Sequence, residues 1–218
     1  MLRNVDLSEI SDGKLYDAND MVKADCKGCE GCSACCRGMG KSIVLDPLDV
    51  HRLTTGLGVP FEALLSQHIE LNVVDGLILP NLKMTESADA CPFLNGQGRC
   101  SIHAYRPGIC RLFPLGRFYE NDSFRYFLQV HECPKPSKAK IKVYKWLDTN
   151  DIHTYEQFIS DWHYFLKALQ ERIAGMEDQA QIRSTCMYVL QQFYLAPCED
   201  FYEAFHGRLD EAKRYFEM

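Results

Sequence analysis

The sequence lacks any long apolar run. No stretch approaches the roughly 18 consecutive apolar residues that a membrane-spanning helix needs. The opening residues, from Met1 to Asp6, have neither the basic region nor the apolar region of a secretory signal peptide. We therefore expect a cytoplasmic protein without a membrane-spanning segment.

Basic residues are outnumbered by acidic ones. The formal net charge is −6 and no basic stripe appears, which argues against nucleic acid as a partner. The strongest basic stretch contains Lys135, Lys138, Lys140, Lys142 and Lys145. We interpret it as a solvated linker. The alternative is that it docks an acidic protein partner. The chain also has no phosphate-binding glycine loop, nucleophile elbow or metalloprotease motif. No common enzyme class is indicated, and the catalytic residues of any enzyme activity stay unknown.

Cysteine, in contrast, is abundant. The chain contains 11 cysteines, most of them between Cys26 and Cys133. With 218 residues, 46% of them hydrophobic, it can fold around an apolar core without disulfides. In a cytosolic chain of this size, crowded cysteines are typical of metal ligation rather than of a disulfide framework.

The cysteines fall into two blocks. The spacing is Cys-x2-Cys-x2-Cys-x2-Cys-Cys in the first block and Cys-x8-Cys-x9-Cys in the second, with one more cysteine after it. Short Cys-x2-Cys turns let two thiolates reach one metal, and pairs from separate segments complete a four-thiolate site. We therefore expect the blocks to converge around zinc or an iron–sulfur cluster, with these candidate ligands: Cys26, Cys29, Cys32, Cys35, Cys36, Cys91, Cys100, Cys110 and Cys133.

The vicinal pair Cys35-Cys36 carries further information. In an extended backbone, neighbouring side chains point to opposite sides, so the pair would serve two centres or two atoms of one cluster. A single cluster with some cysteines left free is a further alternative. His103 and His131 are additional candidate ligands, with a surface or supporting role as the alternative. Cys186 and Cys198 lie outside both blocks and are interpreted as structural; Cys186 falls on an apolar helical face.

Short strands and turns are predicted in the cysteine-bearing part. Asp75-Gly76 and Asn121-Asp122-Ser123 each separate two apolar runs, which predicts two β-hairpins. Residues 42–45 are typical of a short strand. Asp46-Pro47 predicts the start of a helix that ends at Gly56 and Gly58, and Pro60 predicts the start of another.

Helical periodicity dominates from about residue 142. Apolar residues recur at three- and four-residue steps, for example at Phe158, Trp162, Phe165 and Leu169. The predicted fold class is α+β: a small cysteine-rich metal-binding domain with short strands and helices, followed by a C-terminal helical layer. We assign residues 1–25 to a loosely ordered arm with room for one short helix, 26–136 to the metal-binding domain and 137–218 to the helical region.

Three separated motifs carry a family resemblance. They are Cys29-Glu30-Gly31-Cys32-Ser33-Ala34-Cys35-Cys36, then Cys91-Pro92-Phe93-Leu94 with Gly98-Arg99-Cys100-Ser101-Ile102-His103, then Arg106-Pro107-Gly108-Ile109-Cys110-Arg111-Leu112-Phe113-Pro114. In this order they resemble the bacterial cysteine-cluster family with the signature CxxCxxCC, described as zinc- or iron-chelating, and through it the flagellin lysine N-methylases. The resemblance covers roughly residues 26–136. Cys26 is an extra cysteine, and His103 stands where the family usually has tyrosine.

This resemblance implies metal binding more strongly than any activity. The first functional hypothesis is a metal-binding protein whose cofactor is an iron–sulfur cluster, slightly favoured, or Zn²⁺. The second is a protein-modifying enzyme, such as a lysine N-methyltransferase. The third is a zinc-stapled module whose helices bind an unknown protein partner. Neither nucleic acid nor a membrane is expected as a partner.

Overall fold

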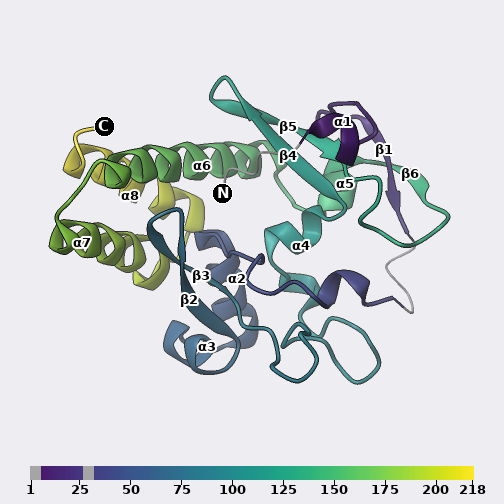
Figure 1. Cartoon of the computed structure of the whole chain (residues 1–218), viewed down its shortest axis with the longest axis horizontal. Helices are drawn as coiled ribbons and strands as arrows, with labels where there is room; N and C mark the ends of the chain where they lie inside the picture. The colour runs from purple at the N-terminus through teal and green to yellow at the C-terminus, as the bar shows by residue number, and fades with distance from the viewer. Residues whose placement is uncertain (1–5, 27–31) are drawn as a thin grey trace.

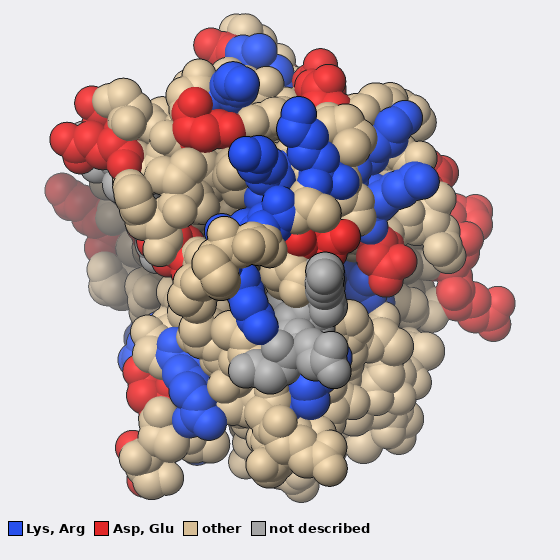
Figure 2. Space-filling view, turned by 90° about the vertical axis from the view of Figure 1, so that its right-hand side faces the viewer, with Lys and Arg blue, Asp and Glu red and all other residues tan. Residues whose placement is uncertain are grey.

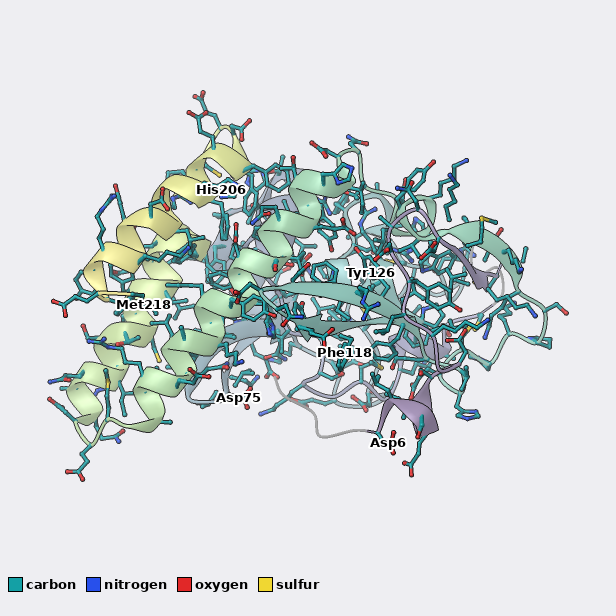
Figure 3. The ribbon with its side chains drawn as sticks, turned by 90° about the horizontal axis from the view of Figure 1, so that it is seen from above. Asp6, Asp75, Phe118, Tyr126, His206 and Met218 are labelled. Carbon is teal, nitrogen blue, oxygen red and sulfur yellow. The ribbon has the colours of Figure 1, made fainter. Side chains whose placement is uncertain are left out.

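The structure is a computed structural model, and it describes residues 6–26 and 32–218. Helices and short antiparallel strand pairs occur together, so the predicted α+β class is confirmed. The C-terminal helices lie at one end, and the N-terminal strand pair lies at the other (Figure 1). Seen from above, His206 and Met218 lie on the helical side, and Asp6 lies on the opposite side (Figure 3). No helix in the described part of the chain is long and apolar enough to cross a membrane.

Both predicted hairpins are confirmed. Strand β2 (Ile69–Val74) pairs with β3 (Leu77–Leu82), and β4 (Leu115–Glu120) pairs with β5 (Ser123–Leu128). The central residues of both turns have positive φ: 48° and 86° at Asp75 and Gly76, and 51° and 56° at Asn121 and Asp122. Asp, Asn and Gly tolerate this conformation, which matches the right-handed twist of the flanking strands.

The N-terminal segment differs from the sequence prediction. After the short helix α1 (Leu7–Ile10), strand β1 (Met21–Asp25) pairs antiparallel with β6 (Ala139–Lys142). Val22 and Ala24 are buried between these elements and the β4–β5 hairpin. The expectation of a loosely ordered arm is wrong for residues 21–25, and that of a lysine-rich linker is wrong for residues 139–142. Both strands are short, and they pair across a long stretch of sequence. Neither is long enough to show the alternation of apolar and polar residues that predicts a strand.

Helix α2 (Pro47–Leu57) begins as predicted. Asp46 and Asp49 form a reciprocal capping box, and Pro47 occupies the first turn. The helix ends at Gly58 (φ 66°), but Gly56 lies inside it, contrary to the prediction. Gly56 has a packing role instead, because a Cβ there would come within 2.6 Å of the Tyr105 ring.

The remaining elements of this half are short. Helix α3 (Phe61–Gln67) follows Pro60, as predicted. Residues 42–45 run beside β3 through two backbone hydrogen bonds and one isolated bridge, rather than forming a full strand. The cysteine loops contain the 3₁₀ turns η1 (Ala34–Cys36) and η2 (His103–Tyr105), followed by helix α4 (Gly108–Leu112).

The predicted C-terminal helical layer is confirmed. It comprises α5 (Val143–Leu147), α6 (Ile152–Ala174), α7 (Gln179–Val189), the π-helical turn η3 (Leu190–Leu195) and α8 (Phe201–Tyr215). Phe158 is completely buried, with its ring 4.7 Å from that of Phe205 and 5.2 Å from that of Phe201. These aromatic contacts belong to one core that continues into α2, α3 and β3.

One face at the N-terminal end is rich in basic side chains. Figure 2 shows lysine and arginine side chains gathered on the upper part of this face. The strand pair and α5 at this end carry exposed Lys23, Lys140 and Lys145. The predicted basic stretch is therefore attached to ordered structure, although the protein as a whole is acidic.

Candidate metal centre

The vicinal cysteines lie on the 3₁₀ turn η1, not on an extended backbone. Backbone hydrogen bonds close this turn from Cys36 N to Ser33 O at 3.0 Å and from Arg37 N to Ala34 O at 3.2 Å. Successive side chains on such a turn diverge by about 120° rather than pointing to opposite sides. The premise of the sequence argument is therefore wrong, although the two side chains still leave the backbone in different directions.

The two thiols of this pair have pKa values shifted in opposite directions. Their hydrogen bond raises the pKa of Cys35 well above its usual value and lowers the pKa of Cys36. Cys36 is thus the thiol of the pair that loses its proton more easily. Thiolates are the form that binds metals, so Cys36 is suited to ligation.

Backbone pairing brings the two cysteine blocks together, as the spacing predicts. Cys91 N donates to Cys36 O at 2.8 Å, and Arg37 forms an isolated antiparallel bridge with Ala90. The Cys91–Cys100 loop then folds back on itself, because Leu94 bridges Cys100. Cys36, Cys91 and Cys100 therefore enter one neighbourhood from two chain segments.

Helix α4 brings a fourth thiol from a third segment. Gly108 N, at its start, donates to Asp49 Oδ1 at 2.6 Å, so the capping box of α2 also holds α4. Cys110 on this helix lies close enough to raise the pKa of Cys36, and its own pKa, raised mainly by burial, is raised further by Cys91 and Cys35. We name Cys36, Cys91, Cys100 and Cys110 the core-side thiols, because the last three pack against the main apolar core.

Burial keeps most core-side thiols protonated. It raises the pKa of Cys91, Cys100 and Cys110, and the nearby Arg106 charge offsets part of the effect at Cys100 and Cys110. Reactive cysteines have lowered pKa values in electropositive surroundings, so these three do not resemble activated nucleophiles. A bound cation would supply the missing positive charge and displace the protons.

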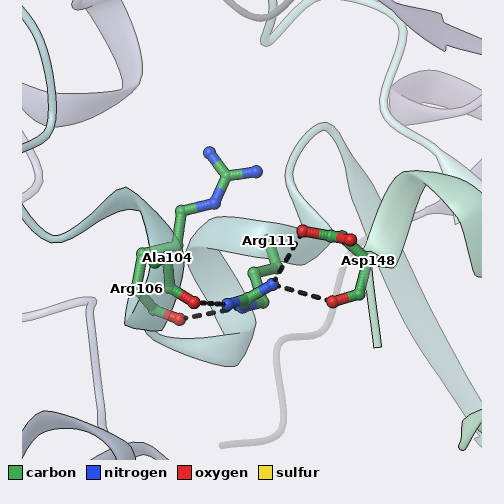
Figure 4. Close-up of polar contacts among 4 residues, drawn as sticks. All are labelled: Ala104, Arg106, Arg111 and Asp148. Carbon is green, nitrogen blue, oxygen red and sulfur yellow. Dashed lines mark hydrogen bonds and ion pairs between the residues drawn. The ribbon is translucent and has the colours of Figure 1, made fainter. Parts of the chain in front are cut away.

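Two arginines beside Cys110 have different roles. Arg111 is buried, and its guanidinium donates to the carbonyl oxygens of Ala104, Arg106 and Asp148 (Figure 4). It therefore braces the loop that precedes α4. The Arg106 side chain points away from these contacts (Figure 4), and its buried Nε has no hydrogen-bond partner among the described residues. An unpaired N–H donor beside thiols fits hydrogen bonding to metal-bound sulfur.

A second set of thiols surrounds a small cavity. Its volume is about 20 Å³, and its lining includes Cys26, Cys32, Cys35 and Cys133, which we name the cavity thiols. The apolar part of the lining includes Phe113, Pro114 and Trp146. Phe113 and Pro114 belong to the third sequence motif, whereas Trp146 was not anticipated, because no motif relates it to the cysteines.

The geometry is that of grouped thiols rather than of a closed coordination sphere. Within residues 6–26 and 32–218, no three Cys, His, Asp or Glu side chains already surround one point as metal ligands. Ligation of a single ion would therefore require side-chain rotation toward that point. The donor set itself fits a thiophilic metal, since it consists of thiols with an unpaired N–H donor nearby.

Other sequence candidates lie elsewhere or cannot be placed. Cys29 lies outside the described residues. Cys186 is buried with its sulfur 3.7 Å from Gly76 O, which confirms the core-thiol interpretation, and Cys198 Sγ lies 3.6 Å from His51 Nδ1. His103 is exposed on η2, and His131 is also exposed. Sequence reasoning treated Asp46 as a cap but missed Asp49, the buried residue that holds α4.

Comparison with known proteins identifies one family. A family model described as CxxCxxCC, "Putative zinc- or iron-chelating domain", matches residues 28–143, slightly more than half of the chain. No curated protein and no solved structure matches significantly. The matched range includes all the core-side thiols and every cavity thiol except Cys26.

Proposed function

The chain belongs to the CxxCxxCC family, and on that premise we propose that it is a metal-binding protein that holds zinc or iron through cysteine thiolates. The core-side thiols Cys36, Cys91, Cys100 and Cys110 are the proposed ligands. The observation that carries this proposal is the backbone hydrogen bond from Cys91 to Cys36, which joins the two cysteine blocks. Four thiols from three segments then occupy one partly buried neighbourhood.

The proposed role of the metal is to tie these three segments together. Residues 32–42 contain no fully buried side chain, so apolar packing contributes little to their position. Four-thiolate sites suit both zinc and iron–sulfur clusters. Bound metal would supply folding free energy at this position, on the order of 10 kcal/mol for a structural zinc in small peptides.

Catalysis at the cysteines receives less support. The cavity that the described residues leave among the cavity thiols measures about 20 Å³. A single water needs roughly 10–15 Å³, so this space holds about one water-sized particle. A lysine side chain and a methyl donor would not fit there together. We therefore propose a metal-binding role and no methyl transfer at this cavity.

Metal analysis after purification without oxygen tests the proposal. We expect stoichiometric zinc in a colourless protein, or iron with broad absorption near roughly 400 nm from a thiolate-bound cluster. Cys91→Ser should reduce the bound metal, whereas Cys186→Ser, which alters a thiol outside both groups, should not. A folded wild-type protein that contains neither zinc nor iron and takes up neither would refute the proposal.

A further inference from the structure

We propose that the chain has a second thiolate centre, formed by the cavity thiols Cys26, Cys32, Cys35 and Cys133, beside the core-side centre. This inference rests on the proposed metal-binding function and extends it. It assigns two metal ions to each chain, each with its own four thiolates. The ligand class is a thiophilic divalent ion such as zinc or ferrous iron.

The strand pair β1–β6 brings two of these thiols together from distant parts of the sequence. Cys26 directly follows β1, where Asp25 lies opposite Ala139 on β6. Cys133 lies shortly before β6, and Lys138 Nζ donates to Cys133 O at 3.1 Å. The pairing that overturned the prediction of a loose arm thus has a functional consequence, because it places Cys26 near Cys133.

The cavity has room for one metal ion among its four thiols. Its volume of about 20 Å³ exceeds the roughly 10–15 Å³ that one water needs, so a single ion fits. One wall is fixed, since Trp146 Nε1 donates to Leu112 O at 3.3 Å and to Phe113 O at 3.2 Å. Cys26 is buried, and the other three cavity thiols are partly buried. Rotation of the four thiols toward one ion would give a site with four protein ligands, which is of the structural type.

The vicinal pair divides the thiols between the two centres. Cys35 lines the cavity, whereas Cys36 is absent from its lining and its carbonyl oxygen accepts a hydrogen bond from Cys91 N at 2.8 Å. Divergence of about 120° on the 3₁₀ turn directs the neighbouring side chains differently. Eight described cysteines are thereby used, four in each group, and Cys186 and Cys198 are left out. One polynuclear cluster that spans both groups is the competing arrangement.

Metal stoichiometry separates these arrangements. The full-length protein would be prepared without metal and without oxygen, and then titrated with cobalt(II) alone, whose thiolate absorption reports occupied sites. We expect two cobalt ions per chain in the wild type and in Cys186→Ser. Cys133→Ser and Cys32→Ser should each retain one tightly bound ion, and so should Cys91→Ser. Circular dichroism would confirm that each variant remains folded.

The outcomes distinguish the two proposals. One ion in the wild type, unaffected by Cys133→Ser and Cys32→Ser but lost in Cys91→Ser, would overturn the second centre and leave the first intact. Loss of all metal from variants of either group would also overturn it, in favour of one shared site. No cobalt or zinc binding by the wild type, together with no iron in the protein as purified, would refute the proposed function itself.

Discussion

The two halves of this protein are held together by different means. Helix α6 alone buries Tyr155, Phe158, Ile159, Trp162, Phe165, Leu169 and Ile173. Residues 32–42, in contrast, bury no side chain completely, and their loop is positioned by backbone hydrogen bonds and by the cysteines it carries. Apolar burial therefore accounts for the helical half, whereas the cysteine loops depend on a different source of free energy. The difference indicates that metal loss should affect the two halves unequally.

Metal removal should produce the largest effect. When the metal is chelated, the backbone amides of residues 32–42 and 91–100 should lose their protection from hydrogen exchange. The reason is that bound metal supplies folding free energy on the order of 10 kcal/mol in small zinc domains. Helices α6 and α8 should keep most of their protection from exchange, since their own buried apolar side chains hold them and the thiols pack only against the border of that core. Hydrogen exchange measured by mass spectrometry, with and without chelator, would test this. An equal loss of protection in both halves would show that the helical half depends on the metal as much as the cysteine loops do.

A core substitution in the helices should have the converse effect. Phe158→Ala removes a completely buried ring that contacts Phe201 and Phe205, which should lower the free energy of unfolding by about 3–5 kcal/mol. The loss should be similar in the metal-loaded and metal-free protein, as measured by urea denaturation followed by circular dichroism. Met187→Ala, at a side chain 48% exposed, is the control and should change little. A loss confined to the metal-free protein would contradict the separation of the two halves.

The difference between local and long-range information explains which features the sequence predicted. The hairpin turns at Asp75-Gly76 and Asn121-Asp122, and the start of α2 at Asp46-Pro47, depend on residues adjacent in sequence, so their chemistry is visible there. The helical layer is visible because its apolar period repeats over many turns. The pairing of β1 with β6 depends on residues far apart, and each strand is too short for a clear pattern.

The candidate site shows the same division. Cysteine spacing predicted that the two blocks meet, and the Cys91–Cys36 hydrogen bond joins them. It did not predict which thiols group together, because that depends on the 3₁₀ turn at Cys35-Cys36 and on the strand pair beside Cys26. Whether all nine predicted cysteines bind metal stays a prediction. Asp49 and Trp146 were missed because their contacts with the cysteine loops arise only in the folded chain.

A smaller effect should follow from loss of the Arg111 brace. Arg111→Met keeps the apolar stem but leaves the carbonyl oxygens of Ala104 and Arg106 without their donor, which should cost about 2–3 kcal/mol. Metal affinity should also fall, since the loop that precedes Cys110 would lose its support. Both quantities would be measured, by denaturation and by competition with a metal-binding dye. Loss of stability without loss of affinity would show that the brace does not support the metal centre.

Arg125→Met is the matched control for Arg111→Met. Its guanidinium lies 3.6 Å from Glu120 Oε2, and both side chains are about half exposed. Exposed ion pairs of this kind contribute about 0–1 kcal/mol, so neither stability nor metal affinity should change appreciably. If Arg125→Met lost as much stability and metal affinity as Arg111→Met, the effect would be due to removal of a charge rather than to loss of support for the loop before α4.

The smallest predicted effect concerns acid and is confined to the helical half. His163 on α6 stacks on Tyr119, with ring centroids 3.5 Å apart, and burial, with the charges of Lys167 and Arg117, lowers its pKa to about 4. The unfolded chain titrates near the ordinary histidine value of about 6.5. It therefore binds more protons between pH 6.5 and 4, and stability is lost as the pH falls through this window.

His163→Phe keeps a ring against Tyr119 and removes this proton linkage. The variant should lose less stability than the wild type between pH 6.5 and 4, by about 1–2 kcal/mol after allowance for partial solvent exposure. Comparing metal-free proteins excludes metal release from protonated thiolates as a cause. Denaturation would be followed by the helical circular dichroism signal. The difference in the free energy of unfolding between the two metal-free proteins would then be due to His163. Parallel pH profiles would show that His163 contributes no acid sensitivity, and that the helical half resists acid by packing alone.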